Sequence, residues 1–153
     1  MTQAFGSWYQ LDEFPYIGQF TLCSDANSIF NGNTNVKRFN SAYTHLDFTS
    51  AISLKAAFNA NYLLEELPDI HVAGALTENN SLDSVFYGCR MLRSVKFIGQ
   101  RSGPANGEYY RMFYTCYSLT TIDGVDFSFA TETSDYYQMF HITRDINTIK
   151  FPG

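Results

Sequence analysis

The sequence has 153 residues, of which 45% are hydrophobic and 16% are charged, a composition that excludes an intrinsically disordered chain. The formal net charge is -5 and no basic stripe is present, which argues against a nucleic-acid-binding protein. The sequence has no run of about 20 apolar residues, so no membrane span is expected, and residues 1–20 lack the basic start and apolar run of a secretory signal.

Phenylalanine recurs along the chain at intervals of 25, 28, 28, 27 and 27 residues, and these repeat phenylalanines set the period of an internal repeat. The positions one before, six after and nine after each of them are apolar in all six units. This agreement predicts a single solenoid domain over residues 1–153, built from about six units of 25–28 residues. The units start near Phe5, Phe30, Phe58, Phe86, Phe113 and Phe140.

In each unit the sequence pattern predicts a short helical turn around the phenylalanine and a short strand after it. Positions four before, one before and three after the phenylalanine have helical spacing, and Asp or Ser, which are preferred helix N-caps, stands five before it in most units. The stretch from six to eleven after it predicts the strand, as in residues 94–97 and 148–151. We therefore expect an α/β repeat with a parallel sheet on one wall and short helical turns on the other.

The predicted strands differ in how they end. The first, third and fifth have Pro15, Pro68 or Gly124 nearby, which predicts strand ends or bulges because proline cannot donate to a ladder. The fourth and sixth continue to an apolar residue eleven after the phenylalanine, Phe97 or Phe151.

Residues 112–122 resemble the BspA-like leucine-rich repeat family. The family pattern is Ala or Met followed by Phe, with Cys three, Leu six and Ile or Leu nine residues after the Phe. The units at Phe58 and Phe86 resemble it too, and the resemblance covers Ala4 to Phe151. Asn33, Asn61 and Thr143 replace the cysteine in three of the other units, which weakens those units as matches but keeps the Phe and Leu anchors, and Trp8 stands at this position in the first unit.

The resemblance implies a leucine-rich-repeat solenoid that adheres or binds protein and performs no chemistry. Members of the family occur on bacterial surfaces, in parasites and in some viral and phage proteins. The resemblance therefore implies a location at the cell surface, outside the cell or on a virion, although a typical surface member carries a signal peptide and residues 1–20 show none.

The cysteines and histidines predict neither a metal site nor catalysis. Cys89 and Cys116 share a repeat position with Asn and Thr, which predicts small buried wall residues, with a disulfide or metal pairing as the alternative; Cys23 lies outside the pattern. With no phosphate-binding loop and no distinct Ser/His/Asp set, we expect no enzyme and no cofactor. The histidines share no repeat position, so we expect no imidazole ladder or metal cluster from His45, His71 and His141.

Charged residues seven and eight after the repeat phenylalanine alternate in sign from unit to unit: Asp12 and Glu13, Lys37 and Arg38, Glu65 and Glu66, then Arg93. Neighbouring parallel strands lie about 4.8 Å apart, so we expect opposite charges side by side. Two interpretations stay open: pairs that set the register and contribute about 0–1 kcal/mol each, or a mixed-charge binding face. If the pattern is a mixed-charge binding face, the candidate partner contacts are Arg38, Asn40, Glu66, Lys96 and Asp123.

Paired tyrosines occur in two near-identical strings, Glu-Tyr-Tyr-Arg-Met-Phe and Asp-Tyr-Tyr-Gln-Met-Phe. The first tyrosine of each pair, Tyr109 or Tyr136, lies on the apolar face and is expected in the core. The second, Tyr110 or Tyr137, points elsewhere and is expected to be exposed. Because exposed tyrosines suit interfaces, Tyr110 and Tyr137 join the candidate partner contacts.

These features favour a non-enzymatic binding or adhesion module that presents its solenoid surface to a protein or glycan partner. The alternative is a structural component of a larger particle, such as a phage or virus virion. The last unit is still apolar at Met139, Phe140, Ile149 and Phe151, although repeat arrays need polar or atypical terminal units. We therefore expect another chain or further sequence to cover this C-terminal coil.

Overall fold

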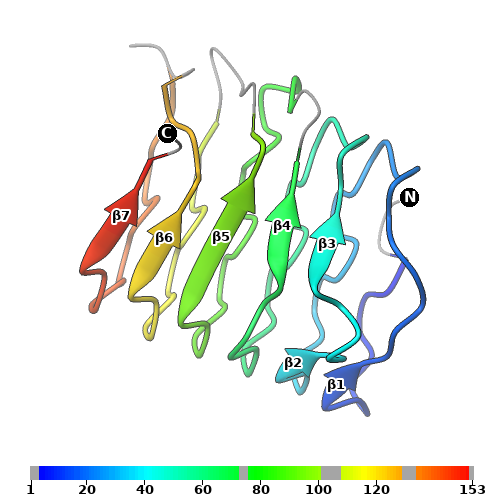
Figure 1. The fold of residues 1–153 in the computed structure, drawn as a ribbon. Coiled ribbons are helices and arrows are strands. Elements are labelled where there is room, and N and C mark those ends of the chain that lie inside the picture. Colours follow the sequence, from blue (N-terminus) through cyan, green and yellow to red (C-terminus); the bar gives the residue numbers. More distant parts are fainter. Residues whose placement is uncertain (1–3, 73–75, 101–107, 129–133, 152–153) are drawn as a thin grey trace.

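The computed structural model describes residues 4–72, 76–100, 108–128 and 134–151, and it is a parallel-strand β-solenoid (Figure 1). We name each coil, one circuit of the chain, by its repeat phenylalanine. The chain makes about five turns from the Phe5 coil at one end to the Phe140 coil at the other. Strands line one wall, and the described residues from four before to two after each repeat phenylalanine form the opposite wall, the turn wall. The repeat solenoid predicted from the sequence is confirmed.

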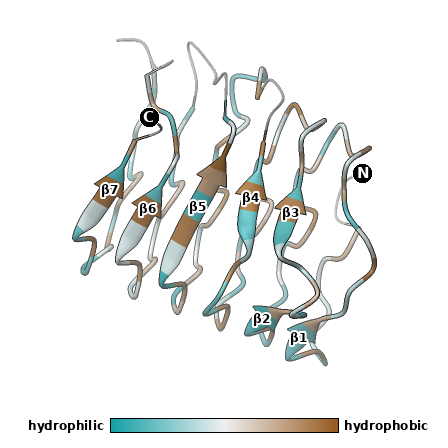
Figure 2. Cartoon of the chain, viewed as in Figure 1, coloured by the Kyte–Doolittle hydropathy of each residue, from teal (hydrophilic) through white to brown (hydrophobic). Residues whose placement is uncertain are grey.

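The described strands are short and pair in parallel. β1 (Glu13–Phe14) and β2 (Arg38–Phe39) form a two-stranded sheet. The second sheet holds, in chain order, β3 (His45–Asp47), β4 (Asp69–His71), β5 (Ser94–Ile98), β6 (Thr121–Asp123) and β7 (Thr148–Lys150). In β5, buried Val95 and Phe97 alternate with exposed residues, and Figure 2 shows hydrophobic bands alternating along the same strand. This is the pattern of a sheet with one packed face.

The strand ends predicted beside Pro15, Pro68 and Gly124 are confirmed. β1 ends directly before Pro15, β4 begins directly after Pro68, and β6 ends directly before Gly124. At Gly124 the backbone has a φ of 71°, and an added Cβ would overlap the carbonyl oxygen of Phe97. Only glycine fits there, because the longer strand β5 passes alongside.

The repeat phenylalanines form a continuous stack through the core. Successive ring centroids from Phe5 to Phe140 lie 5.5–5.8 Å apart. Phe58, Phe86 and Phe113 are fully buried, which confirms the buried row predicted from the repeat. Aromatic pairs at this separation add about 0.5–1.5 kcal/mol to the effect of burial alone.

The predicted helical turns are wrong: the described residues contain no helix. A left-handed backbone recurs two residues before and two residues after the repeat phenylalanine, with φ of 51–64°, or 78° at glycine. A right-handed helix cannot pass through such residues, because it needs φ near about −63°. The left-handed residues at these positions are Ser7, Ser28, Gly32, Ala56, Ala60, Ser84, Gly88, Arg111, Thr115, Gln138 and Ile142.

Backbone hydrogen bonds on the turn wall run from each coil to the next. From the Phe30 coil, N–H groups donate to carbonyl oxygens of the Phe58 coil at 2.8–3.2 Å in the pairs Ala26–Ser53, Ser28–Lys55, Phe30–Ala57 and Gly32–Asn59. The N–H groups between these donors close tight turns within their own coil. Ile29 N–H, for example, donates to Ala26 O. Successive turns therefore produce the three-to-four spacing of apolar residues that suggested a helix.

The residue three after the repeat phenylalanine ties neighbouring coils together. Asn61 Nδ2 donates to Phe30 O at 3.0 Å and to Phe58 O at 2.7 Å, and Cys89 Sγ donates to Phe58 O at 3.1 Å. Cys89 and Cys116 are fully buried free thiols, which confirms their prediction as small wall residues. Burial raises the pKa of Cys89 to about 12, so its thiol stays protonated and can donate.

Phe86→Ala should lower the free energy of unfolding by about 3–5 kcal/mol, because it removes a buried ring from the middle of the stack. Urea denaturation measures the change. Phe140→Ala is the matched control, since Phe140 is 37% exposed at the end of the same stack, and its loss should be clearly smaller. Equal losses for the two variants would contradict the stacked core.

Asn61→Leu should cost about 1–3 kcal/mol, because it leaves the buried Asn33 N–H without its acceptor, Asn61 Oδ1 at 3.0 Å, and removes one of the two side-chain donors to each of Phe30 O and Phe58 O. Asn61→Cys keeps one donor, as Cys89 does in the next coil, and should be less destabilising. Thermal and urea unfolding of the two variants provide the comparison. If Asn61→Cys is as unstable as Asn61→Leu, the bond to the phenylalanine carbonyl is not what this position requires.

Candidate functional site

The two sheets are separate because the Phe30 coil carries two strands, β2 and β3, joined by residues 40–44. β2 pairs back to β1, whereas β3 pairs forward to β4 with Leu46 opposite Ile70. In the Phe58 coil the strand begins only after Pro68, which lacks the N–H that a ladder needs. The sheet is therefore interrupted beside β2.

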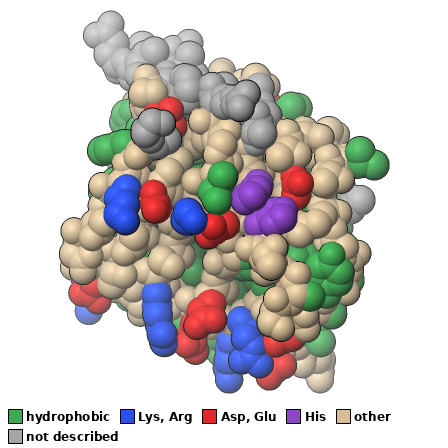
Figure 3. Space-filling view, viewed as in Figure 1, with side chains coloured by type: hydrophobic (Ala, Val, Ile, Leu, Met, Phe, Trp, Pro, Cys, Tyr) green, Lys and Arg blue, Asp and Glu red, His purple; other side chains and the backbone are tan. Residues whose placement is uncertain are grey.

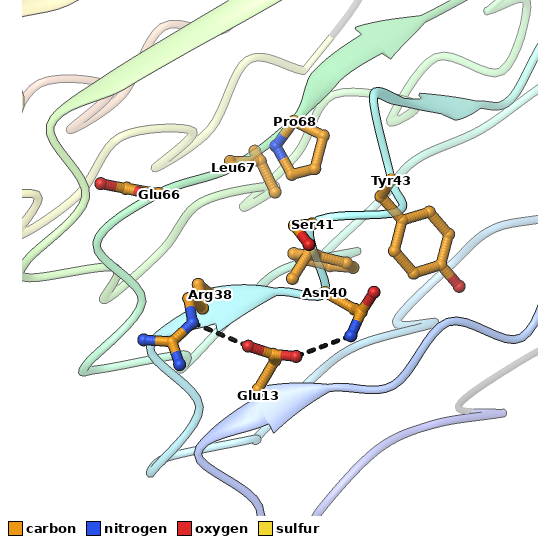
Figure 4. A pocket seen from close by; sticks show the side chains of 9 residues that line it. Glu13, Arg38, Asn40, Ser41, Tyr43, Glu66, Leu67 and Pro68 are labelled. Carbon is orange, nitrogen blue, oxygen red and sulfur yellow. Dashed lines mark hydrogen bonds and ion pairs between the residues drawn. The ribbon is translucent and has the colours of Figure 1, made fainter.

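A pocket of about 410 Å³ opens at this interruption (Figure 4). Three of the predicted contact residues, Arg38, Asn40 and Glu66, line it together with Glu13 and Ser41. The apolar part of the lining consists of Phe39, Tyr43, Leu67 and Pro68. The interrupted sheet thus places charged, amide and hydroxyl groups around one hollow with an apolar wall.

Glu13 fixes the polar side of the pocket. Its carboxylate accepts hydrogen bonds from Arg38 Nε at 2.7 Å and from Asn40 Nδ2 at 2.8 Å (Figure 4). The bond from Arg38, followed by that from Asn40, lowers the pKa of Glu13 below its ordinary value. Within the part of the chain that the structure describes, the terminal guanidinium nitrogens of Arg38 make no hydrogen bond. These nitrogens are available as donors to a ligand.

Glu66 occupies the opposite side of the pocket. Its side chain extends away from the Glu13–Arg38 pair in Figure 4 and is exposed. None of the described residues forms an ion pair with it. The pocket therefore has an available carboxylate acceptor as well as the guanidinium donors of Arg38.

Lys96 and Asp123 lie outside the pocket, in a row of alternating charge across the five-stranded sheet (Figure 3). Lys96 Nζ lies 2.6 Å from Asp69 Oδ2, and Lys96 and Asp123 are paired residues of β5 and β6. From β4 to β7 the row consists of Asp69, Lys96, Asp123 and Lys150, and His45 of β3 lies opposite Asp69. The predicted juxtaposition of opposite charges is confirmed in two further pairs, Glu13 with Arg38 at 2.7 Å and Glu65 with Arg93 at 3.0 Å. These contacts agree with both interpretations of the pattern, charge pairs that set the strand register and a mixed-charge binding face.

His45 and His71 stack on each other with ring centroids 4.2 Å apart, a pair that the repeat positions do not predict. Residues 40–44 displace β3 along the chain, so a count from the phenylalanine no longer aligns the two histidines. The signal that reveals them is a reversed pair of strings, His-Leu-Asp in β3 and Asp-Ile-His in β4. The strand register places His45 opposite Asp69 and Asp47 opposite His71, so all four side chains share the sheet face.

Tyr110 and Tyr137 lie on the turn wall, and their ring centroids are 5.4 Å apart. Tyr110 is half-buried beneath the Arg111 guanidinium, 4.5 Å from its ring centroid, and Tyr137 is exposed. Tyr109 is buried as predicted, whereas Tyr136 is 44% exposed because no described coil covers the Phe140 coil. The candidate contacts therefore fall into three separate groups: the pocket, the charge row and the tyrosine pair.

No protein-family model, curated protein or solved structure matches the chain. Within residues 4–72, 76–100, 108–128 and 134–151, no three His, Cys, Asp or Glu side chains are placed to hold a metal ion. The same residues include no helix that is long and apolar enough to span a membrane. The proposed function is therefore based on the pocket and the exposed surfaces.

The buried hydroxyl of Tyr109 predicts a loss of stability at alkaline pH. It has no hydrogen-bond partner among the described residues, and burial, followed by nearby Tyr136 and Asp126, raises its pKa to about 12. An unfolded tyrosine ionises near pH ~10. Between these two values the unfolded state holds fewer protons than the folded state, so the free energy of unfolding must fall as pH rises.

Tyr109→Phe should reduce this alkaline loss, measured by urea unfolding at a series of pH values on both sides of the ordinary tyrosine pKa. Tyr137→Phe, at an exposed position, is the control and should follow the unsubstituted chain. The same decline in all three proteins would show that the Tyr109 hydroxyl is not responsible.

Proposed function

We propose that this chain is a non-enzymatic binding module that receives a glycan, or a protein with similar polar groups, on its sheet face. The observation that carries the proposal is the pocket of about 410 Å³ at the sheet interruption, which Arg38, Asn40 and Glu66 line. Ligand sites are typically concave and combine apolar surface with a few oriented polar groups. This hollow has both.

The polar groups of the pocket suit a ligand rich in hydroxyl groups. Arg38 donates hydrogen bonds, Glu66 accepts them, and the Ser41 hydroxyl does both. A sugar hydroxyl also donates and accepts, so it can bond to each of these groups. Leu67 and Pro68 add a half-buried apolar surface against which the C–H face of a sugar ring can pack.

The arrangement of Glu13 favours binding because it orders the site in advance. Glu13 holds both Arg38 and Asn40 through hydrogen bonds of 2.7 and 2.8 Å. Arg38 and Asn40 therefore lose less conformational freedom when a ligand binds than mobile side chains would.

The resemblance to BspA-like leucine-rich repeats supports the same function, and we propose that the solenoid is a divergent leucine-rich repeat. Its location would then be the cell surface, the exterior or a virion. The second candidate function is a structural component of a larger particle. The observation that favours it is the exposed apolar surface of the Phe140 coil, where Phe151 is 66% exposed.

Arg38→Ala should weaken glycan binding by about tenfold or more, because a hydrogen bond to a charged group contributes about 1.5–3 kcal/mol. A glycan array identifies the ligand, and isothermal titration calorimetry measures its affinity. Lys96→Ala is the matched control, since Lys96 is an exposed cation of the same sheet outside the pocket, and it should bind normally.

Two results would contradict the proposal. One is the absence of any glycan or protein ligand for the folded chain. The other is a ligand whose affinity is unchanged by both Arg38→Ala and Asn40→Ala, since that ligand would bind elsewhere on the solenoid.

A further inference from the structure

We infer that the Phe140 coil is a docking face for the Phe5 coil of a second copy of this chain, so that copies join head to tail. The inference concerns the two ends of the solenoid and is independent of the pocket. Three sets of contacts carry it: backbone hydrogen bonds, apolar side chains and arginine–tyrosine pairs. The first two sets run between all successive described coils, and the arginine–tyrosine pairs join two of the junctions.

Backbone donors point outward from the Phe140 coil. The Phe113 coil donates to it at 2.9–3.1 Å in the pairs Arg111–Tyr137, Phe113–Met139 and Thr115–His141. In the Phe140 coil the equivalent N–H groups have no acceptor among the described residues; they belong to Gln138, Phe140 and Ile142. A row of unpaired N–H groups at this spacing is a template for one more coil.

Apolar side chains that are buried in interior coils are exposed in this one. Phe140 is 37% exposed, whereas Phe113 is fully buried in the preceding coil. Ile149 is 41% exposed, whereas Ile122 at the same position is fully buried. A coil placed against the Phe140 coil would cover both side chains and remove their apolar surface from water.

The outer edge of β7 is open, in contrast to that of β3. The side-chain amide of Gln19 caps β3, because it donates to His45 O at 3.0 Å and accepts from Asp47 N–H at 3.1 Å. Within residues 134–151 and the rest of the described chain, no side chain caps β7 in this way. An uncapped edge strand pairs readily with another chain.

The Phe5 coil offers the matching acceptors. In interior coils, the carbonyl groups one before and one after the repeat phenylalanine accept from the preceding coil, as those of Ile29 and Asn31 do. The equivalent carbonyl groups of the Phe5 coil belong to Ala4 and Gly6, and no described donor reaches them. They match the N–H groups of Phe140 and of the residue two after it in another copy.

Arginine–tyrosine contacts join two pairs of neighbouring coils. The Arg90 guanidinium lies 4.6 Å from the ring centroid of Tyr62, and that of Arg144 lies 5.6 Å from the ring centroid of Tyr117. All four residues stand four after their repeat phenylalanine. Tyr9 holds this position in the Phe5 coil and is 57% exposed. In a head-to-tail pair, Arg144 would lie between Tyr117 of its own chain and Tyr9 of the next.

The direction of the hydrogen bonds excludes a symmetric pair of Phe140 coils on this wall, because both would present donors. The contact must be heterologous, with a different face from each copy. Such a contact does not close on itself unless its rotation completes a ring, so each added copy leaves a new end exposed.

Sedimentation velocity of the 153-residue chain tests the inference. The mean size should rise with concentration across the micromolar range. Ile149→Lys alters the Phe140 face and Tyr9→Lys places a cation opposite Arg144, so each should weaken association by at least about tenfold. Met91→Lys is the matched control, because Met91 is 41% exposed like Ile149 but lies in an interior coil, and it should associate normally.

A mixture of the two variants is the decisive measurement. Ile149→Lys keeps an intact Phe5 face and Tyr9→Lys keeps an intact Phe140 face, so an equimolar mixture should form a dimer with one copy of each. A monomer at every concentration, a dimer of either variant alone, or a mixture that stays monomeric would overturn the inference. Circular dichroism checks folding, and Phe151→Lys, at a residue 66% exposed, serves as a second variant of the Phe140 face.

Discussion

Hydrogen bonds between successive coils on the turn wall are the interaction on which the rest of this solenoid depends. They use left-handed residues on both sides of each repeat phenylalanine, and this backbone excludes a helix. The same spacing stacks the phenylalanine rings 5.5–5.8 Å apart and brings Asn61 or Cys89 to a phenylalanine carbonyl of the preceding coil. The strands have only two to five residues, and the turn wall adds regular backbone hydrogen bonds between successive coils.

The core could be predicted from the sequence, but the backbone of the turn wall could not. Burial of Phe58, Phe86 and Phe113 follows from their period, because a buried position tolerates few residue types. The left-handed backbone has a weaker signature: Gly32 and Gly88 show it, but Arg111 and the other equivalent positions do not. Apolar spacing of three and four residues fits both a helix and successive tight turns, so spacing alone did not distinguish them.

The residues of the candidate site could be predicted more readily than their grouping. Arg38 and Glu66 stand out because charge alternates at their positions, and Pro68 predicts where a strand stops. Their convergence depends on a change of register within the Phe30 coil. There β2 pairs with β1, whereas the later strand β3 pairs with β4. The same change of register brings His45 against His71. Numbering each unit from its phenylalanine assumes that the register stays constant. It therefore predicts neither the grouping of the pocket residues nor the stacking of His45 on His71.

The uniform direction of the bonds on the turn wall also has an electrostatic consequence. Peptide dipoles that point the same way add together, as they do along a helix, whereas the dipoles of a sheet largely cancel. Here N–H groups point toward the Phe140 coil and carbonyl groups toward the Phe5 coil. The turn wall therefore carries a net dipole along the solenoid axis, positive at the Phe140 end. The formal net charge of -5 does not reveal this polarity, which makes one end of the molecule favourable to anionic groups and the other unfavourable.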